Sequence, residues 1–279
     1  MRLIAIDMDH TLLKEDKTFD KARCKTYFQK LIDQGDVICI ASGNNLVTLK
    51  KYFDKDFDQL VYYAADNGNR IMKNNHFIDE VSINHDYFLN MMNYLDSYDD
   101  FHPVVTTDLK PYTKQPEDKI LDQLNIFFKG YEVVDSYEEV PKDRLITKVS
   151  LHTFTASRTK MSEIIEGKFD QITAVKSAPN WMDTYNRNGG KGHAITYLQN
   201  KYNISNENTI SFGDSLNDAS MMSQSKYSVA MSNADPALKE LCDYEIGSNE
   251  DGAVIDIIEL IAKNDNWDFM DEFRKTNKG

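Results

Sequence analysis

Two aspartates one residue apart, Asp7 and Asp9, are well suited to chemistry. They follow the apolar run Leu3–Ile6, which is typical of a buried parallel strand. Open α/β sheets bind ligands at the carboxyl ends of such strands, so one aspartate could attack a substrate there while the other moves a proton. Asp is also common in turns, and this pair taken alone is equally compatible with a structural turn.

A second acidic pair, Asp214 and Asp218, lies near the other end of the chain. It follows the strand-like stretch Thr209–Phe212 and precedes the helix-like stretch Ala219–Met222. Mg²⁺ prefers hard oxygen ligands and usually takes one or two carboxylates together with water and a substrate phosphate. The two acidic pairs together therefore predict a Mg²⁺ site.

Groups suited to holding a phosphate lie between the two acidic pairs. Ser42 and Gly43 follow the apolar run Val37–Ala41, and Lys191 follows two glycines at the expected start of a helix. A hydroxyl, free backbone N–H groups at a helix start and a lysine together bind phosphate well. A lone lysine at a helix start is usually solvated, but its charge opposes the helix dipole there, which favours a neighbouring anion.

The order of these motifs along nearly the whole chain resembles the haloacid dehalogenase-like phosphatase superfamily, and most closely its Cof-like branch with a type IIB cap. The motifs are Asp-x-Asp-x-Thr, Ser-Gly, a long insertion, Gly-Gly-Lys-Gly and Gly-Asp-x-x-Asn-Asp. Each motif is weak alone, but the four in this order are specific.

The resemblance implies a role for each motif residue. Asp7 is expected to be the nucleophile, and Asp9 the general acid and base, with its backbone carbonyl also on the metal. The expected phosphate-binding residues are Met8, Ser42, Gly43, Lys191 and Asn217. The expected Mg²⁺ site contains Asp7, Asp9 and Asp214. Asp218 is expected to support the metal or Lys191 without binding the ion directly.

Three residues near the motifs are candidates for selecting the substrate. His10 stands where many relatives carry glycine; its imidazole could touch the phosphate or leaving group, although a ring turned toward solvent or cap is favoured. Asn44 replaces a common arginine of this branch, which removes a bidentate donor. Asn67 lies in an expected turn at a strand end, near the ligand crevice.

The insertion supplies further candidates for contact with the leaving group. Arg158 and Trp181 are the two put forward for substrate selection, and His152 and Asn180 are also considered. Such residues are more often packed or solvated than ligand-binding, since few polar groups line a pocket.

The elements that must position these residues alternate between strand and helix, which predicts an α/β fold with a Rossmann-like parallel-sheet core. Apolar spacing predicts helices over 24–31, 45–53, 193–202 and 254–261, and strands over 37–41, 60–65, 209–212 and 227–230. Asn74 and Asn75 separate two short apolar stretches and predict a small hairpin.

The middle of the chain has its own strands and helices but none of the motifs. Strands are expected over 104–107, 147–151, 171–175 and 181–184, and helices over 87–98, 118–128 and 158–165. We therefore expect a catalytic core from residues 1–81 and 185–279 and an inserted α/β cap domain over 82–184. By resemblance the cap closes over the site, where it excludes water and selects the substrate.

Composition narrows the class of protein. With 279 residues, 41% hydrophobic and 28% charged, the chain is typical of a globular protein, and its net charge of −13 argues against nucleic-acid binding. No run is long enough to cross a membrane and no signal peptide is recognisable, so a cytoplasmic location is expected. Three scattered cysteines indicate neither disulfides nor zinc, and Cys24 and Cys39 are expected in the core.

The leading hypothesis is a Mg²⁺-dependent phosphatase that hydrolyses small phosphomonoesters through an aspartyl phosphate. Sugar phosphates are the first candidate substrates, followed by phosphorylated cofactors such as flavin mononucleotide or pyridoxal phosphate. Two alternatives stay open, a phosphomutase built on the same core and a non-catalytic regulator that binds a phosphorylated metabolite. Fold and chemistry do not by themselves fix the leaving group.

Overall fold

The computed structural model describes residues 1–98, 101–153, 158–178 and 180–276, with side chains at 158–161 and 178 not described. The chain divides into two compact units, a core of Met1–Glu80 with Gly190–Gly279 and an inserted unit of Val81–Gly189. The inserted unit ends at Gly189 rather than at residue 184, because its last strand, β11 (Trp181–Asn186), and the turn after it continue past the expected boundary.

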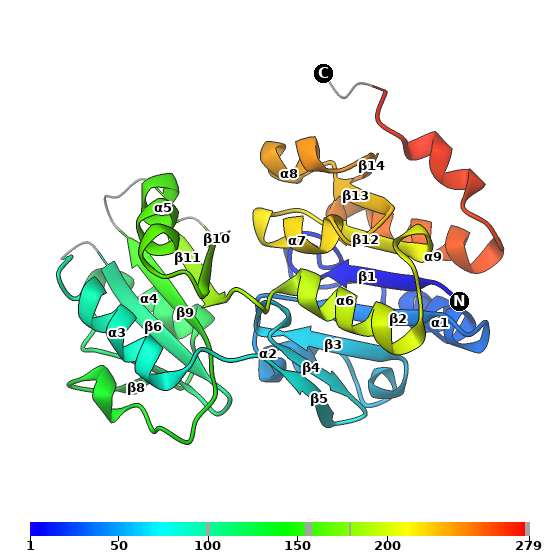
Figure 1. Cartoon of the computed structure of the whole chain (residues 1–279). Coiled ribbons are helices and arrows are strands. Elements are labelled where there is room, and N and C mark those ends of the chain that lie inside the picture. Colours follow the sequence, from blue (N-terminus) through cyan, green and yellow to red (C-terminus); the bar gives the residue numbers. More distant parts are fainter. Residues whose placement is uncertain (99–100, 154–157, 179, 277–279) are drawn as a thin grey trace. The chain divides into compact units, whose positions relative to one another are not determined.

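The core unit is built on an eight-stranded sheet with the order β14-β13-β12-β1-β2-β3-β4-β5 (Figure 1). Neighbours from β14 to β3 pair in parallel, and β4 and β5 pair antiparallel. The strands are β1 (Leu3–Asp7), β2 (Val37–Ala41), β3 (Val61–Ala65), β4 (Arg70–Lys73), β5 (His76–Glu80), β12 (Thr209–Gly213), β13 (Tyr227–Met231) and β14 (Tyr244–Ile246). Since β1 to β3 are buried along their whole length, they read as continuous apolar runs.

Helices separate the core strands along the chain, and one more follows β14. They are α1 (Lys21–Asp33), α2 (Leu46–Tyr52), α6 (Lys191–Tyr202), α7 (Ala219–Met222), α8 (Pro236–Leu241) and α9 (Ala253–Lys263). Arg23 of α1 pairs with Asp256 and Glu259 of α9, which ties these two helices together. A six-residue 3₁₀ helix, Asp268–Phe273, follows near the C-terminus, where Met270 is buried against the core.

Local signals explain several boundaries. Asn45 caps α2 by accepting from the Thr48 amide at 2.9 Å. Asn74 and Asn75 both adopt positive φ, 50° and 64°, as a two-residue hairpin turn requires, so the predicted hairpin is confirmed. Apolar spacing did not predict α8 or the three-residue strand β14, because elements this short carry little periodicity.

The inserted unit contains a six-stranded, mostly antiparallel sheet with the order β10-β11-β9-β6-β7-β8. Its further strands are β6 (Phe101–Thr107), β7 (Pro111–Thr113), β8 (Glu132–Val133), β9 (Ile146–Thr153) and β10 (Ile172–Ala178). Its helices are α3 (His85–Leu95), α4 (Asp118–Phe127) and α5 (Arg158–Lys168). Two apolar clusters stabilise it, one around α3 and one between α4 and the sheet.

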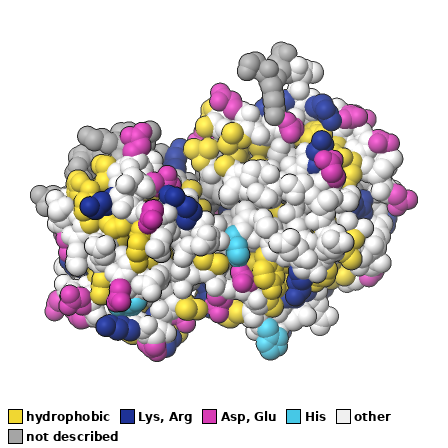
Figure 2. Space-filling model, in the orientation of Figure 1, with side chains coloured by type: hydrophobic (Ala, Val, Ile, Leu, Met, Phe, Trp, Pro, Cys, Tyr) yellow, Lys and Arg dark blue, Asp and Glu magenta, His cyan; other side chains and the backbone are white. Residues whose placement is uncertain are grey.

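No helix among the described residues is long and apolar enough to cross a bilayer. Acidic side chains are spread over both units on the face drawn in Figure 2, in keeping with the net charge of −13. Cys24 and Cys39 are fully buried free thiols, as expected of core residues, and Cys242 is buried as well. The predicted α/β class with a parallel-sheet core is confirmed.

Candidate active site

The strand register brings the acidic motifs together at one edge of the core sheet. β1 lies between β2 and β12, with Asp7 level with Ala41 and Ile6 level with Phe212. The carboxyl ends of these parallel strands meet at the same edge, where open α/β sheets bind ligands. Asp7, Ser42 and Asp214 therefore follow or end three adjacent strands.

A buried lysine lies at the centre of this edge. Lys191 Nζ donates to Asp7 Oδ1 and to Asp218 Oδ1, each at 2.5 Å, and the lysine is completely buried. Lys191 begins α6, as the sequence predicted. Burial would lower the pKa of Lys191, but Asp218 and Asp7 outweigh it and raise the pKa above its ordinary value, so the ammonium stays charged.

Three carboxylates surround this ammonium. Asp7, Asp214 and Asp218 each offer an oxygen, and these oxygens lie within 4.8 Å of one another. Both oxygens of Asp218 are already engaged, one by Lys191 and the other by the backbone amides of Asp214 and Ser215 at 3.0 Å. Asp7 and Asp214 are therefore better placed than Asp218 to bind a cation directly.

Burial, with neighbouring carboxylates adding to it, raises the pKa values of the two candidate ligands. Burial raises the pKa of Asp7 well above its usual range, with Lys191 opposing and Asp218 and Asp214 adding to the rise. Burial raises the pKa of Asp214 to about 7, with Asp218 adding repulsion. If all four groups are ionised, three carboxylates and one ammonium leave a formal charge of −2, which a divalent cation would balance. The donor set fits Mg²⁺, which prefers carboxylate oxygens.

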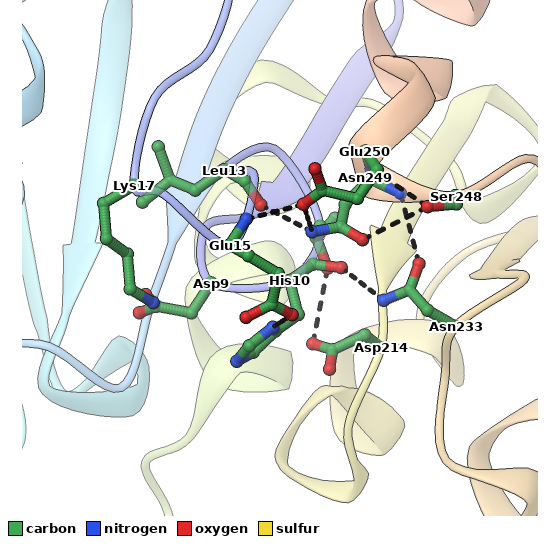
Figure 3. Close-up of polar contacts among 11 residues, drawn as sticks. Asp9, His10, Leu13, Glu15, Lys17, Asp214, Asn233, Ser248, Asn249 and Glu250 are labelled. Atoms are coloured by element: carbon green, nitrogen blue, oxygen red, sulfur yellow. Dashed lines mark hydrogen bonds and ion pairs between the residues drawn. The ribbon is translucent and has the colours of Figure 1, made fainter.

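Asp9 lies apart from this cluster and has its own partners. Its Oδ1 accepts from Lys17 Nζ at 2.7 Å and its Oδ2 from Asn44 Nδ2 at 2.5 Å, so the carboxylate is held from two sides (Figure 3 draws the Lys17 contact). The sequence did not point to Lys17, because a lysine in a polar turn carries no motif. Asn44, a candidate for substrate selection, instead contacts Asp9.

Hydrogen bonds join the loop after β1 to the neighbouring loops, as Figure 3 shows. Asn233 Nδ2 donates to the carbonyl of His10 at 2.8 Å, and Asn249 Nδ2 donates to that of Leu13 at 2.9 Å. Thr11 Oγ1 lies 3.4 Å from Asp214 Oδ1 and donates to it. These contacts fix the turn that carries Asp9.

The remaining sequence candidates fall in different surroundings. His10 adopts positive φ, 58°, and its half-exposed ring pairs with Glu15 at 3.0 Å. The side chain of Met8 is fully buried in the core, which leaves only its backbone for phosphate. Asn67 accepts from Asn217 Nδ2 at 3.1 Å, beside Gly43.

The substrate-contact candidates of the inserted unit also fall in different surroundings. Trp181, a candidate for substrate selection, is 3% exposed, packs against α4, and donates from Nε1 to Gln123 at 2.7 Å, so the ring stabilises the inserted unit. His152 is buried 4.9 Å from the Trp181 ring, and Asn180 is exposed in a turn with φ 61°. Arg158 begins α5, but its side chain lies outside the described residues.

Comparison with known proteins identifies the family. The family model for haloacid dehalogenase-like hydrolases matches residues 4–258. The phosphatase YbjI of Escherichia coli is 24% identical over 267 residues, covering 95% of this chain and 97% of that protein, and YcsE of Bacillus subtilis is 26% identical over 253 residues, covering 90% and 92%. Both are named 5-amino-6-(5-phospho-D-ribitylamino)uracil phosphatases.

A solved structure agrees in fold over nearly the same span. The structure of SMU.1108c from Streptococcus mutans has a TM-score of 0.88 at 24% identity and covers 95% of this chain and 100% of that one. The chain therefore belongs to the haloacid dehalogenase-like hydrolase family, and its predicted assignment as a phosphatase of this family is confirmed.

Proposed function

We propose that this phosphatase hydrolyses small phosphomonoesters with the help of Mg²⁺, using Asp7 as the nucleophile. The observation that carries the proposal is the buried ammonium of Lys191 between Asp7 and Asp218, with Asp214 close by. A divalent cation bound there would bring the formal charge of the cluster from −2 to zero, so that an anionic phosphate could approach the carboxyl edge of the parallel sheet.

Asp7 and Asp214 would hold the Mg²⁺, with Asp218 keeping Lys191 and the 214–215 backbone in place. When bound, the ion would offset the repulsion between carboxylate and phosphate and orient the substrate for in-line attack. Lys191, the Ser42 hydroxyl and the Asn217 amide would bind the phosphate oxygens.

The reaction then needs two displacements. In the first, an Asp7 oxygen forms a bond to phosphorus as the ester P–O bond breaks, and Asp9 gives its proton to the leaving alcohol. In the second, Asp9 takes a proton from water as the water oxygen attacks the aspartyl phosphate and Asp7 is released. Lys17 and Asn44 would hold Asp9 in position for both transfers.

The substrate is expected to meet the inserted unit through its leaving group, since the motifs handle the phosphate that all substrates share. The names of the E. coli and B. subtilis relatives make a phosphorylated sugar alcohol linked to a pyrimidine the first compound to assay, followed by hexose phosphates, flavin mononucleotide and pyridoxal phosphate. We propose the unit Val81–Gly189 as the cap that makes this selection.

The test is hydrolysis of p-nitrophenyl phosphate and of the substrate panel by wild type and Asp7→Asn. The amide is a poor nucleophile, so turnover should disappear while the protein stays folded. Asp33→Asn, an exposed change at the end of α1, is the matched control and should retain activity. An Asp7→Asn rate close to wild type would contradict the proposal. Free phosphate released in step with the alcohol distinguishes a phosphatase from a mutase, and turnover itself excludes a pure binding protein.

A further inference from the structure

A short buried turn after β3 adopts a backbone that is costly for its residues. Asp66 and Asn67 are consecutive left-handed residues, with φ of 51° and 59°, and Gly68 follows at 85°. Asp66, Asn67 and Asn69 are each no more than 1% exposed. Residues other than glycine adopt this region uncommonly, with Asn and Asp the most frequent exceptions, and such backbone concentrates at functional sites.

The first contact of this 66–69 turn is with the loop after β2. The amide of Asn67 donates to the carbonyl of Ser42 at 2.8 Å. A Cβ on Gly43 would lie 3.2 Å from Asn67 Oδ1, tighter than an ordinary contact. The position of the Ser42–Gly43 backbone is therefore set by Asn67.

The second contact is with the loop after β12. Asn217 Nδ2 donates to Asn67 Oδ1 at 3.1 Å. A carboxamide has two N–H groups and one oxygen, so fixing one N–H fixes the direction of the other polar atoms. Asn67 therefore orients the amide of Asn217.

The third contact is with the start of α6. The amide of Gly190 donates to Asn69 Oδ1 at 3.0 Å. A Cβ on Gly68 would lie 2.5 Å from the Gly190 carbonyl and 2.8 Å from Lys191 Cα, so only glycine permits this approach. The turn thus fixes the backbone at Gly190 and Lys191, from which the Lys191 side chain reaches Asp7.

We propose that the 66–69 turn is the positioning element of the phosphate site, with Asn67 acting through Asn217 and the 42–43 backbone, and Asn69 through the start of α6. The turn joins three segments that are distant in sequence and that, on the proposed function, bind the same phosphate. This role accounts for the unusual backbone, because the left-handed Asn67 directs its carboxamide to Asn217 and its backbone amide to Ser42. Asn67 is accordingly a positioning residue rather than a substrate contact.

The test separates phosphate binding from metal binding. Asn67→Gly keeps the left-handed backbone and deletes the carboxamide, and Asn203→Gly, at the exposed left-handed C-cap of α6, is the matched control. With inorganic phosphate as a product inhibitor of p-nitrophenyl phosphate hydrolysis, Asn67→Gly should raise the inhibition constant and KM about tenfold. The Mg²⁺ concentration for half activation should change far less than the phosphate constant, because Asn67 contacts Ser42 and Asn217, which are proposed to bind phosphate rather than the metal.

A double-mutant cycle with Asn217→Ala tests whether Asn67 acts through Asn217. The double variant should bind phosphate at most about twofold more weakly than Asn217→Ala does. Fully additive losses, an unchanged phosphate constant in Asn67→Gly, or equal losses of phosphate and Mg²⁺ binding would each overturn the inference. If Asn67→Gly fails to fold, Asn217→Ala decides alone, and an unchanged phosphate constant overturns the inference.

The same measurements keep this inference distinct from the proposed function. If wild type released no phosphate from any substrate, the proposed function would fail. If wild type is active and only the Asn67 prediction fails, the positioning role alone is lost.

Discussion

Asp214→Asn should change how the stability of the metal-free protein depends on pH. Burial raises the pKa of Asp214 from 3.8 to about 7, so the folded protein holds this proton more tightly than the unfolded chain. The stability that protonated Asp214 contributes to the fold is therefore fully present below pH 3.8 and is lost as the pH rises through 7. A shift of this size corresponds to roughly 2–3 kcal/mol of stability lost between pH 5 and pH 7.5.

The assay is thermal unfolding in EDTA at pH 5 and pH 7.5 for wild type, Asp214→Asn and the control Asp33→Asn. At about 2–4 °C per kcal/mol for a chain of this size, the wild-type Tm should fall about 5–10 °C further than that of Asp214→Asn over this interval. Asp33→Asn should behave like wild type, which removes the general effect of losing one carboxylate from an acidic protein.

Mg²⁺ should reverse the loss in the wild type, because an ion bound by the ionised carboxylates stabilises the folded state. At a hundred times the dissociation constant the gain is about 2.7 kcal/mol. The gain should be larger at pH 7.5 than at pH 5, since the ion competes with the protons. Identical pH dependence of wild type and Asp214→Asn would refute the electrostatic reasoning, and an equal Mg²⁺ response of the two proteins would refute Asp214 as a ligand.

Two further changes probe the surroundings of the site. Lys17→Met removes the donor that lies 2.7 Å from Asp9 Oδ1. On an alkyl phosphate, kcat/KM should fall roughly tenfold, which is less than the 10²–10⁴-fold typical of losing a general acid altogether. The loss should be smaller on p-nitrophenyl phosphate, because its leaving group needs little protonation. Equal losses on both substrates would argue against a role through Asp9. Trp181→Ala should destabilise the inserted unit by about 3–5 kcal/mol in denaturant unfolding, and Trp181→Phe should recover most of it. A Phe variant with normal stability but altered ratios of kcat/KM between substrates would support Trp181 as a substrate contact.

The inserted unit shows where sequence reasoning reached its limit. Its helices and longer strands were expected in roughly the right places, but the short strands β7 and β8 and the environment of Trp181 were not. An aromatic residue in a strand has the same local pattern whether its face is covered by a helix or open to a ligand. Only the packing of α4 over that face, with Gln123 as the partner of the indole N–H, decided between the two.

The sequence by itself determined the family, the parallel-sheet core, the ends of the strands that carry Asp7, Ser42 and Asp214, and the start of α6 at Lys191. These follow from apolar runs, glycines and motif order, all of which are local signals. Tertiary structure alone decided that Lys191 joins Asp7 across 184 residues of sequence, that Asp9 is held by Lys17 and Asn44, and that the 66–69 turn links three loops. The reason is physical: residue type fixes what a side chain can do, but distance, burial and the resulting pKa arise only when the sheet register and loops bring distant segments together.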